Sequence, residues 1–130
     1  MELKKLTPNL MVFNVNSTVE FYRDILGFEL VMTVPEKGLF DWAMVRLGAV
    51  EIMFQSRSSL SQEIPIMNIR ETGGSLTFYI EMAGLDELYA GIKSKLPIVY
   101  DLHKTFYGMR EFSIKDINGY ILTFAEKSPE

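Results

Sequence analysis

The sequence contains no cysteine, and among its 130 residues there is a single histidine, His103, and a single tryptophan, Trp42. The absence of thiols excludes disulfides, thiolate metal sites and cysteine nucleophiles, and it is typical of a cytoplasmic protein. No apolar run is long enough to cross a bilayer. There is no basic stripe, and the net charge of −4 disfavours nucleic acid as a ligand. We therefore expect no membrane partner and no nucleic-acid partner.

The most informative segment is residues 14–28, which read NVNSTVEFYRDILGF. The pattern predicts the end of a strand, a helix over residues 18–26, and the start of a second strand. Ser17 is expected to cap the helix, and Glu20, three residues later, to complete a capping box. Gly27 is expected to end the helix in the left-handed conformation. The apolar face of this helix consists of Val19, Tyr22, Ile25 and Leu26.

The same order of elements is predicted twice along the chain. The first helix is accompanied by strands predicted at residues 6–15, 28–34, 39–47 and 50–55. A second helix at residues 85–96 is accompanied by strands predicted at residues 75–82, 98–102, 109–115 and 120–125. Residues 56–74 are polar and aperiodic, which predicts a linker or a lid. The sequence therefore predicts a single α+β domain over residues 1–130, in which two βαβββ modules form a curved mixed β-sheet with helices on its outer face.

Two short turns set the register of the predicted hairpins. Residues 48–49 are Gly-Ala, which favours a type II′ turn, and residues 118–119 are Asn-Gly, a strong hairpin signal. The first turn places Arg46 opposite Glu51. This pair is either a structural ion pair worth about 0.2–1 kcal/mol or a site where the carboxylate meets a cationic ligand.

Alternation along the strands separates two faces of the predicted sheet. The face expected to pack under the helices carries Leu10, Val12, Ala43, Val45, Leu47, Ile52, Phe54, Leu76, Phe78, Ile80, Leu122 and Phe124. The opposite face is mixed and carries Thr7, Asn9, Met11, Phe40, Trp42, Met44, Arg46, Glu51, Met53, Gln55, Ser75, Thr77, Tyr79, Ile121 and Thr123. Such a face is expected to hold a ligand or to meet a partner.

Two groups on or near this face are candidates for binding. The first is an aromatic and methionine cluster, which either packs in the core or in a dimer interface or forms a pocket that stacks planar groups; it consists of Met11, Phe40, Trp42, Met44 and Met53. The second group, Tyr107, Arg110 and Phe112, flanks the turn at Gly108 and either fills an interface or, through Arg110, binds an anion.

Several segments together resemble the vicinal oxygen chelate superfamily, which includes glyoxalase I, extradiol dioxygenases, and fosfomycin and bleomycin resistance proteins. The segments are residues 12–14, 17–22, 26–28, 108–112 and 116–120. The resemblance implies the paired βαβββ fold and a homodimer with clefts near the subunit interface. It also implies that bleomycin-resistance-like members bind a cationic, partly aromatic drug in such clefts.

Metal-dependent members of this superfamily hold their metal at four positions of the sheet. By resemblance these positions correspond to Thr7, Glu51, Ser75 and Thr123, of which only Glu51 carries a conventional metal-binding group. His103 falls outside these positions and reads as a loop or surface histidine, with a general base as the alternative. We therefore expect no metal and no other cofactor.

These observations favour a metal-independent binding protein for an antibiotic or other toxic small molecule, with no catalytic residue. The alternatives are a metal-dependent glyoxalase-like lyase or dioxygenase, and a member that acts only in protein interaction. The expected ligand-binding residues are Met11, Phe40, Trp42, Met44, Glu51, Met53, Tyr79, Tyr107 and Arg110.

Overall fold

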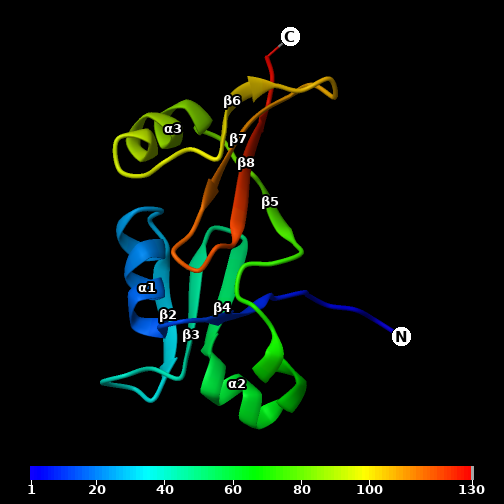
Figure 1. Ribbon diagram of the computed structural model, residues 1–130. Helices are drawn as coiled ribbons and strands as arrows, with labels where there is room; N and C mark the ends of the chain where they lie inside the picture. Colours follow the sequence, from blue (N-terminus) through cyan, green and yellow to red (C-terminus); the bar gives the residue numbers. More distant parts are fainter. Residues whose placement is uncertain (130) are drawn as a thin grey trace. The chain divides into compact units, whose positions relative to one another are not determined.

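The computed structural model describes residues 1–129. The chain divides into two compact units: unit one, Met1–Thr72, and unit two, which begins at Gly73. Each unit contains a four-stranded mixed sheet with helices (Figure 1). None of the helices in the described residues is both long enough and apolar enough to span a membrane.

Unit one contains sheet one, in which the strands are ordered β1-β4-β3-β2 and β1 runs parallel to β4. Its strands are β1 (Asn9–Val12), β2 (Glu29–Val34), β3 (Trp42–Leu47) and β4 (Val50–Ser56). Unit two contains sheet two, with the equivalent order β5-β8-β7-β6 and a parallel pair of β5 and β8. Its strands are β5 (Thr77–Glu81), β6 (Tyr100–Lys104), β7 (Met109–Lys115) and β8 (Ile121–Lys127). The repeated order confirms the predicted α+β class.

Helix α1 (Val15–Asp24) starts three residues earlier than predicted, because its N-cap is Asn14 and not Ser17. The side chain of Asn14 accepts a hydrogen bond of 2.8 Å from the backbone N–H of Ser17, so Ser17 lies within the first turn. The helix ends at Asp24, two residues before the predicted end, whereas the left-handed glycine predicted to follow it is confirmed. Gly27 adopts φ +83°, and its N–H donates to the carbonyl of Arg23 at 3.1 Å.

The core of unit one lies between α1 and one face of sheet one. Tyr22 of α1 is fully buried, and its ring centroid lies 4.8 Å from that of Phe54 in β4 and 5.6 Å from that of Phe28. Burying a side chain of this size stabilises the fold by roughly 1.5–3 kcal/mol. The helix-facing residues predicted for sheet one are buried with the exception of Leu47, which is 47% exposed because it adjoins the hairpin turn at the end of β3.

The core of unit two forms in the same way under helix α3 (Leu85–Lys93). The ring of Tyr89 in α3 packs edge-on against Phe112 of β7, with centroids 5.2 Å apart. The carboxylate of Glu126 accepts hydrogen bonds from the backbone N–H groups of Gly84 and Leu85 and so caps this helix.

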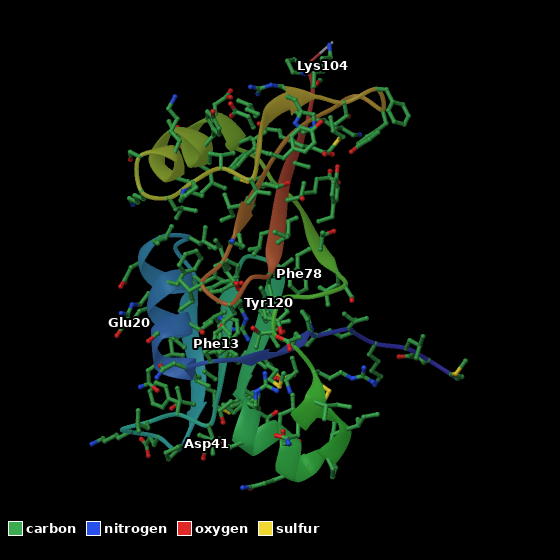
Figure 2. The ribbon with its side chains drawn as sticks, in the orientation of Figure 1. Phe13, Glu20, Asp41, Phe78, Lys104 and Tyr120 are labelled. Atoms are coloured by element: carbon green, nitrogen blue, oxygen red, sulfur yellow. The ribbon has the colours of Figure 1, made fainter. Side chains whose placement is uncertain are left out.

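One edge of this core is less covered than predicted. Leu76 precedes β5 and is 45% exposed, so its predicted place in the core is wrong. Phe78 and Ile80 are half-buried. Phe78 still contacts Tyr120, which is buried, with ring centroids 6.5 Å apart; both residues are labelled in Figure 2.

Both hairpins form at the predicted positions. In the first, Leu47 pairs with Val50, and a positive φ at Gly48 but not at the following alanine fits the predicted type II′ turn. In the second, Gly119 adopts φ +92° and its N–H donates to the carbonyl of Asp116.

The segment at residues 56–74 is not the irregular linker that the sequence predicted. It contains helix α2 (Arg57–Glu63) and a 3-10 turn, η1 (Pro65–Ile69). Ser56 caps α2, and among its residues only Leu60 is buried. A helix of two turns with one buried apolar residue leaves no detectable helical period, which explains why the pattern was missed.

Candidate functional site

A cavity of about 380 Å³ opens in unit one where the end of sheet one meets α2. Its lining residues come from all four strands of sheet one, the loop before β3, and α2; they are Asn9, Val34, Asp41, Trp42, Gln55, Ser59 and Glu63. Figure 2 shows Asp41 at this end of unit one, close to α2. We call this cavity the Trp42 pocket.

A chain of hydrogen bonds fixes the polar wall of the Trp42 pocket. The side-chain amide of Asn9 donates to Oε1 of Gln55 at 2.8 Å. The amide nitrogen of Gln55 donates to the hydroxyl of Ser59 at 2.9 Å and to a carboxylate oxygen of Glu63 at 3.1 Å. Gln55 is only 4% exposed, and both ends of its amide are occupied. The wall is therefore held in one arrangement and ties α2 to sheet one.

The charge of the pocket is negative. The carboxylates of Asp41 and Glu63 line it beside the half-buried indole of Trp42, and the described lining includes no lysine or arginine. An indole ring offers a flat apolar surface and also attracts cations, and carboxylates attract them as well. The arrangement suits a cation that carries a planar or apolar group.

The loop that carries Asp41 is held by Asn16 of α1. The side chain of Asn16 donates to the carbonyl of Gly38 and accepts from the N–H of Phe40, both at 2.9 Å. The backbone of Asp41 then donates to the carbonyl of Val34 at 2.7 Å and accepts from the N–H of Ser56 at 2.9 Å. The bonds of Asn16 hold Gly38 and Phe40 in a loop, and β3 begins at Trp42 and not at residue 39 as predicted.

The structure brings only one of the nine predicted ligand-binding residues, Trp42, into this pocket. Met44 and Met53 face each other in adjacent strands, Met11 is 2% exposed, and Phe40 lies in the loop held by Asn16. The other residues that line the pocket were not predicted to contact a ligand. Asn9 and Gln55 were placed on the correct face by alternation, whereas Ser59 and Glu63 were hidden in the segment read as a linker.

The predicted cross-strand pair of Arg46 and Glu51 is confirmed. The guanidinium of Arg46 contacts Oε2 of Glu51 at 2.5 Å, and Lys5 forms an ion pair with Oε1. Both oxygens of this carboxylate are thus engaged by cations. The side chain of Glu51 is only 9% exposed, whereas those of Arg46 and Lys5 are 46% and 58% exposed.

The donors at the four positions matched to metal ligands do not fit a divalent metal. Glu51 is neutralised by two cations, and Thr7, Ser75 and Thr123 offer only hydroxyls. The hydroxyl of Thr123 is hydrogen-bonded to that of Ser113 at 2.8 Å. Residues 1–129 contain no cluster of three or more His, Asp or Glu side chains arranged for a metal.

Unit two brings two predicted residues, Tyr79 and Tyr107, onto one carboxylate. Their hydroxyls donate to the same oxygen, Oε2 of Glu111, at 2.6 Å and 2.5 Å. Glu111 is 6% exposed. Its acceptance of these hydrogen bonds raises the pKa of both tyrosines above the ordinary range, and burial adds to the effect. The sequence analysis did not identify Glu111. Alternation along β7 places Glu111 on the same face as Ser113, and this was the available signal.

The remaining predicted contact of unit two, Arg110, lies apart from this carboxylate. Arg110 precedes Glu111 in β7 and therefore points to the other face, where its guanidinium binds Asp86 of α3 at 2.6 Å. This ion pair lowers the pKa of Asp86. His103 lies opposite Glu111 in β6, and its Nδ1 donates to the carbonyl of Asp101 at 2.8 Å.

Comparisons of the sequence with known proteins point to one superfamily. The model of the Glyoxalase/Bleomycin resistance protein/Dioxygenase superfamily matches residues 6–124. A bleomycin resistance protein from Geobacillus stearothermophilus is 28% identical over 125 residues, which cover 92% of this chain and 94% of that protein. One from Staphylococcus aureus has the same identity and coverage.

Solved structures show the same fold at low sequence identity. A glyoxalase/bleomycin resistance protein/dioxygenase from Nocardioides superposes with a TM-score of 0.79 at 14% identity, over 98% of this chain and 86% of that chain. A lactoylglutathione lyase from Agrobacterium tumefaciens superposes with a TM-score of 0.72 at 18% identity, over 97% and 95%. The chain belongs to the glyoxalase/bleomycin resistance protein/dioxygenase superfamily.

Proposed function

We propose that this protein binds a small cationic compound that carries an aromatic group, and that it sequesters the compound without a metal and without chemical change. The observation that carries the proposal is the Trp42 pocket, in which an indole lies beside the carboxylates of Asp41 and Glu63. Its volume of about 380 Å³ falls in the range of small-molecule sites. The similar proteins named bleomycin resistance proteins support this class of ligand.

The metal-independent part of the proposal is supported by the donor set described above. A catalytic divalent metal is normally held by at least three side chains from His, Asp, Glu or Cys. The matched positions supply one carboxylate, and that carboxylate already pairs with Arg46 and Lys5.

Fluorescence of Trp42 tests the proposal directly, since it is the only tryptophan in the chain. The wild-type protein is titrated with bleomycin, with phenethylammonium chloride, and with 2-phenylethanol as a neutral counterpart of similar shape. We expect the ammonium compound to bind at least ~10-fold more tightly than the alcohol, a difference of about 1.4 kcal/mol. Equal binding of the alcohol, or no quenching by bleomycin or by the ammonium compound although acrylamide reaches Trp42, would contradict the proposal.

Two substitutions identify the carboxylates. Glu63→Gln and Asp41→Asn are expected to weaken binding of the ammonium compound several-fold while leaving that of the alcohol unchanged, because each removes one charge from the pocket. Glu71→Gln is the matched control, an exposed acid of unit one outside the pocket. Dialysis against EDTA should leave binding unchanged. About one tightly bound transition metal per chain by plasma mass spectrometry would overturn metal independence.

We also propose that the protein is a homodimer, as the family resemblance implies. In support, β2 is an edge strand of sheet one, and its side chains Met32 and Val34 are 58% and 53% exposed. Light scattering of the purified protein should give twice the chain mass of 14.9 kDa. A mass of one chain at micromolar concentration would refute this part of the proposal.

A further inference from the structure

The carboxylate of Glu111 in unit two has an unusual set of partners. Two phenol hydroxyls, from Tyr79 in β5 and Tyr107 before β7, donate to its Oε2 atom at 2.6 Å and 2.5 Å. Both contacts are as short as hydrogen bonds to an ionised carboxylate usually are. We call these three residues the Glu111 cluster.

The carboxylate of Glu111 has no cationic partner at ion-pair distance among residues 1–129, and the residue opposite it in β6 is His103. Glu111 belongs to none of the four ion pairs formed among residues 1–129, although it is only 6% exposed. An unpaired carboxylate at such a position costs free energy that two neutral donors offset only in part. A cation bound from solution would supply the missing charge.

The second oxygen of the carboxylate is available to such a cation. Both hydrogen bonds recorded for Glu111 fall on Oε2, and Oε1 has no donor among the described residues. Oε1 is also not among the buried polar atoms that lack a partner, so solvent reaches it. A donor that approaches from solvent can therefore reach this atom without displacing either tyrosine.

The rings around the carboxylate favour an organic cation. Tyr79 is 52% exposed and Tyr107 is 53% exposed, so both phenol rings meet solvent beside a buried charge. The ring of Phe106, itself fully exposed, makes an edge-on contact with that of Tyr107, with centroids 5.0 Å apart. Aromatic surfaces attract ammonium groups and their alkyl substituents.

We propose that the Glu111 cluster is a second binding site, specific for a protonated alkylamine. The ammonium N–H donates to Oε1 of Glu111, and the alkyl group lies against the exposed rings of Tyr79 and Tyr107. The site is separate from the Trp42 pocket and does not depend on the function proposed for that pocket. Unlike the Trp42 pocket, the Glu111 cluster requires an N–H donor on the ligand and no aromatic group.

NMR titration of the full-length, ¹⁵N-labelled protein tests this site. The probes are butylammonium chloride, 1-butanol as the neutral counterpart, and tetramethylammonium chloride, which has the charge but no N–H. We expect saturable shifts at residues 79, 107 and 111 with butylammonium, at least ~10-fold weaker binding of tetramethylammonium, and no saturation with butanol.

Substitutions distinguish binding at the Glu111 cluster from a purely structural role of these residues and from binding in the Trp42 pocket. Glu111→Gln should abolish the shifts, whereas Glu87→Gln, which removes an exposed acid of α3, should leave them intact. Tyr107→Phe keeps the ring and frees the acceptor, so binding should stay within about twofold or tighten, while Tyr107→Leu should weaken it several-fold.

Three results would overturn the proposal. The first is the absence of butylammonium shifts in unit two of the wild type, which would leave the cluster a structural clamp only. The second is unchanged binding in a folded Glu111→Gln variant. The third is equal saturation with butanol. Shifts confined to the Trp42 indole would refute this site and leave the proposal for the Trp42 pocket standing.

Discussion

Trp42 and Gln55 lie directly opposite each other in the adjacent strands β3 and β4, and both line the same pocket. The indole contributes its apolar and cation-attracting surface, while the buried amide of Gln55 holds the polar wall in place. The pair joins the rigid sheet to the short helix α2. Ligand binding and local stability at this end of unit one therefore depend on the same contacts.

Replacing Gln55 tests that dependence. Gln55→Leu removes three side-chain hydrogen bonds and leaves Asn9, Ser59 and Glu63 without their shared partner. We expect the free energy of unfolding to fall by about 1–3 kcal/mol. Urea denaturation followed by circular dichroism measures the change. Gln62→Leu, at an exposed position of α2, is the matched control and should change stability by less than about 0.5 kcal/mol.

Asn14 is the observed N-cap of α1, and Ser17 is the predicted one. Replacing each residue in turn distinguishes between them. Asn14→Ala should lower the free energy of unfolding by about 0.5–2 kcal/mol, because its side chain accepts the hydrogen bond from the N–H of Ser17. Ser17→Ala keeps that N–H and should have a much smaller effect. Thermal melts of both variants decide the matter, and a larger loss for Ser17→Ala would show that Ser17 is the cap after all.

Asn16 is expected to control the loop before β3. Asn16→Ala removes the two hydrogen bonds to Gly38 and Phe40, so the loop that carries Asp41 should loosen. We expect faster amide exchange at residues 38–41 and a few-fold weaker binding of phenethylammonium. Asn68→Ala, at an exposed residue of η1, provides the comparison. Exchange rates in that loop that match the wild type would argue against this role for Asn16.

Alkaline titration should reveal the hydrogen-bonded tyrosines. Of the six tyrosines, Tyr79 and Tyr107 have raised pKa values through Glu111, and Tyr89 has one through Asp101. Because the folded-state pKa values lie above the unfolded value of about 10, the folded state binds more protons than the unfolded state above that pH. The stabilisation is thus complete below about pH 10 and is lost as pH rises through the folded pKa values.

Tyrosinate absorbance and denaturation above pH 10 measure both effects. The double variant Tyr79→Phe, Tyr107→Phe should remove the late titration of those two groups and flatten the loss of stability with pH. Tyr89→Phe serves as the comparison, since it removes a late-titrating group bound to a different carboxylate. All tyrosines ionising together in the folded protein would contradict the assignment.

Much of the fold was predictable because it depends on local and periodic signals. Alternation along the strands, the Gly-Ala and Asn-Gly turns and the glycine after α1 predicted the positions of the strands in both units to within a few residues. The errors occur where a local signal was ambiguous. Ser17 and Asn14 are both capable caps, and only the backbone decides which of them accepts the hydrogen bond. Helix α2 has one buried residue, so its helical period was undetectable.

The sequence by itself determined the superfamily, the repeated module and the shortage of metal-binding side chains, because these follow from residue types and their spacing. Tertiary structure decided which polar side chains share a site. Glu63 reaches the Trp42 pocket only because α2 folds back onto sheet one, and Glu111 meets Tyr79 only because β8 brings β5 and β7 to either side of it. The contact between Tyr79 and Glu111 joins residues 32 positions apart, and no local pattern encodes it.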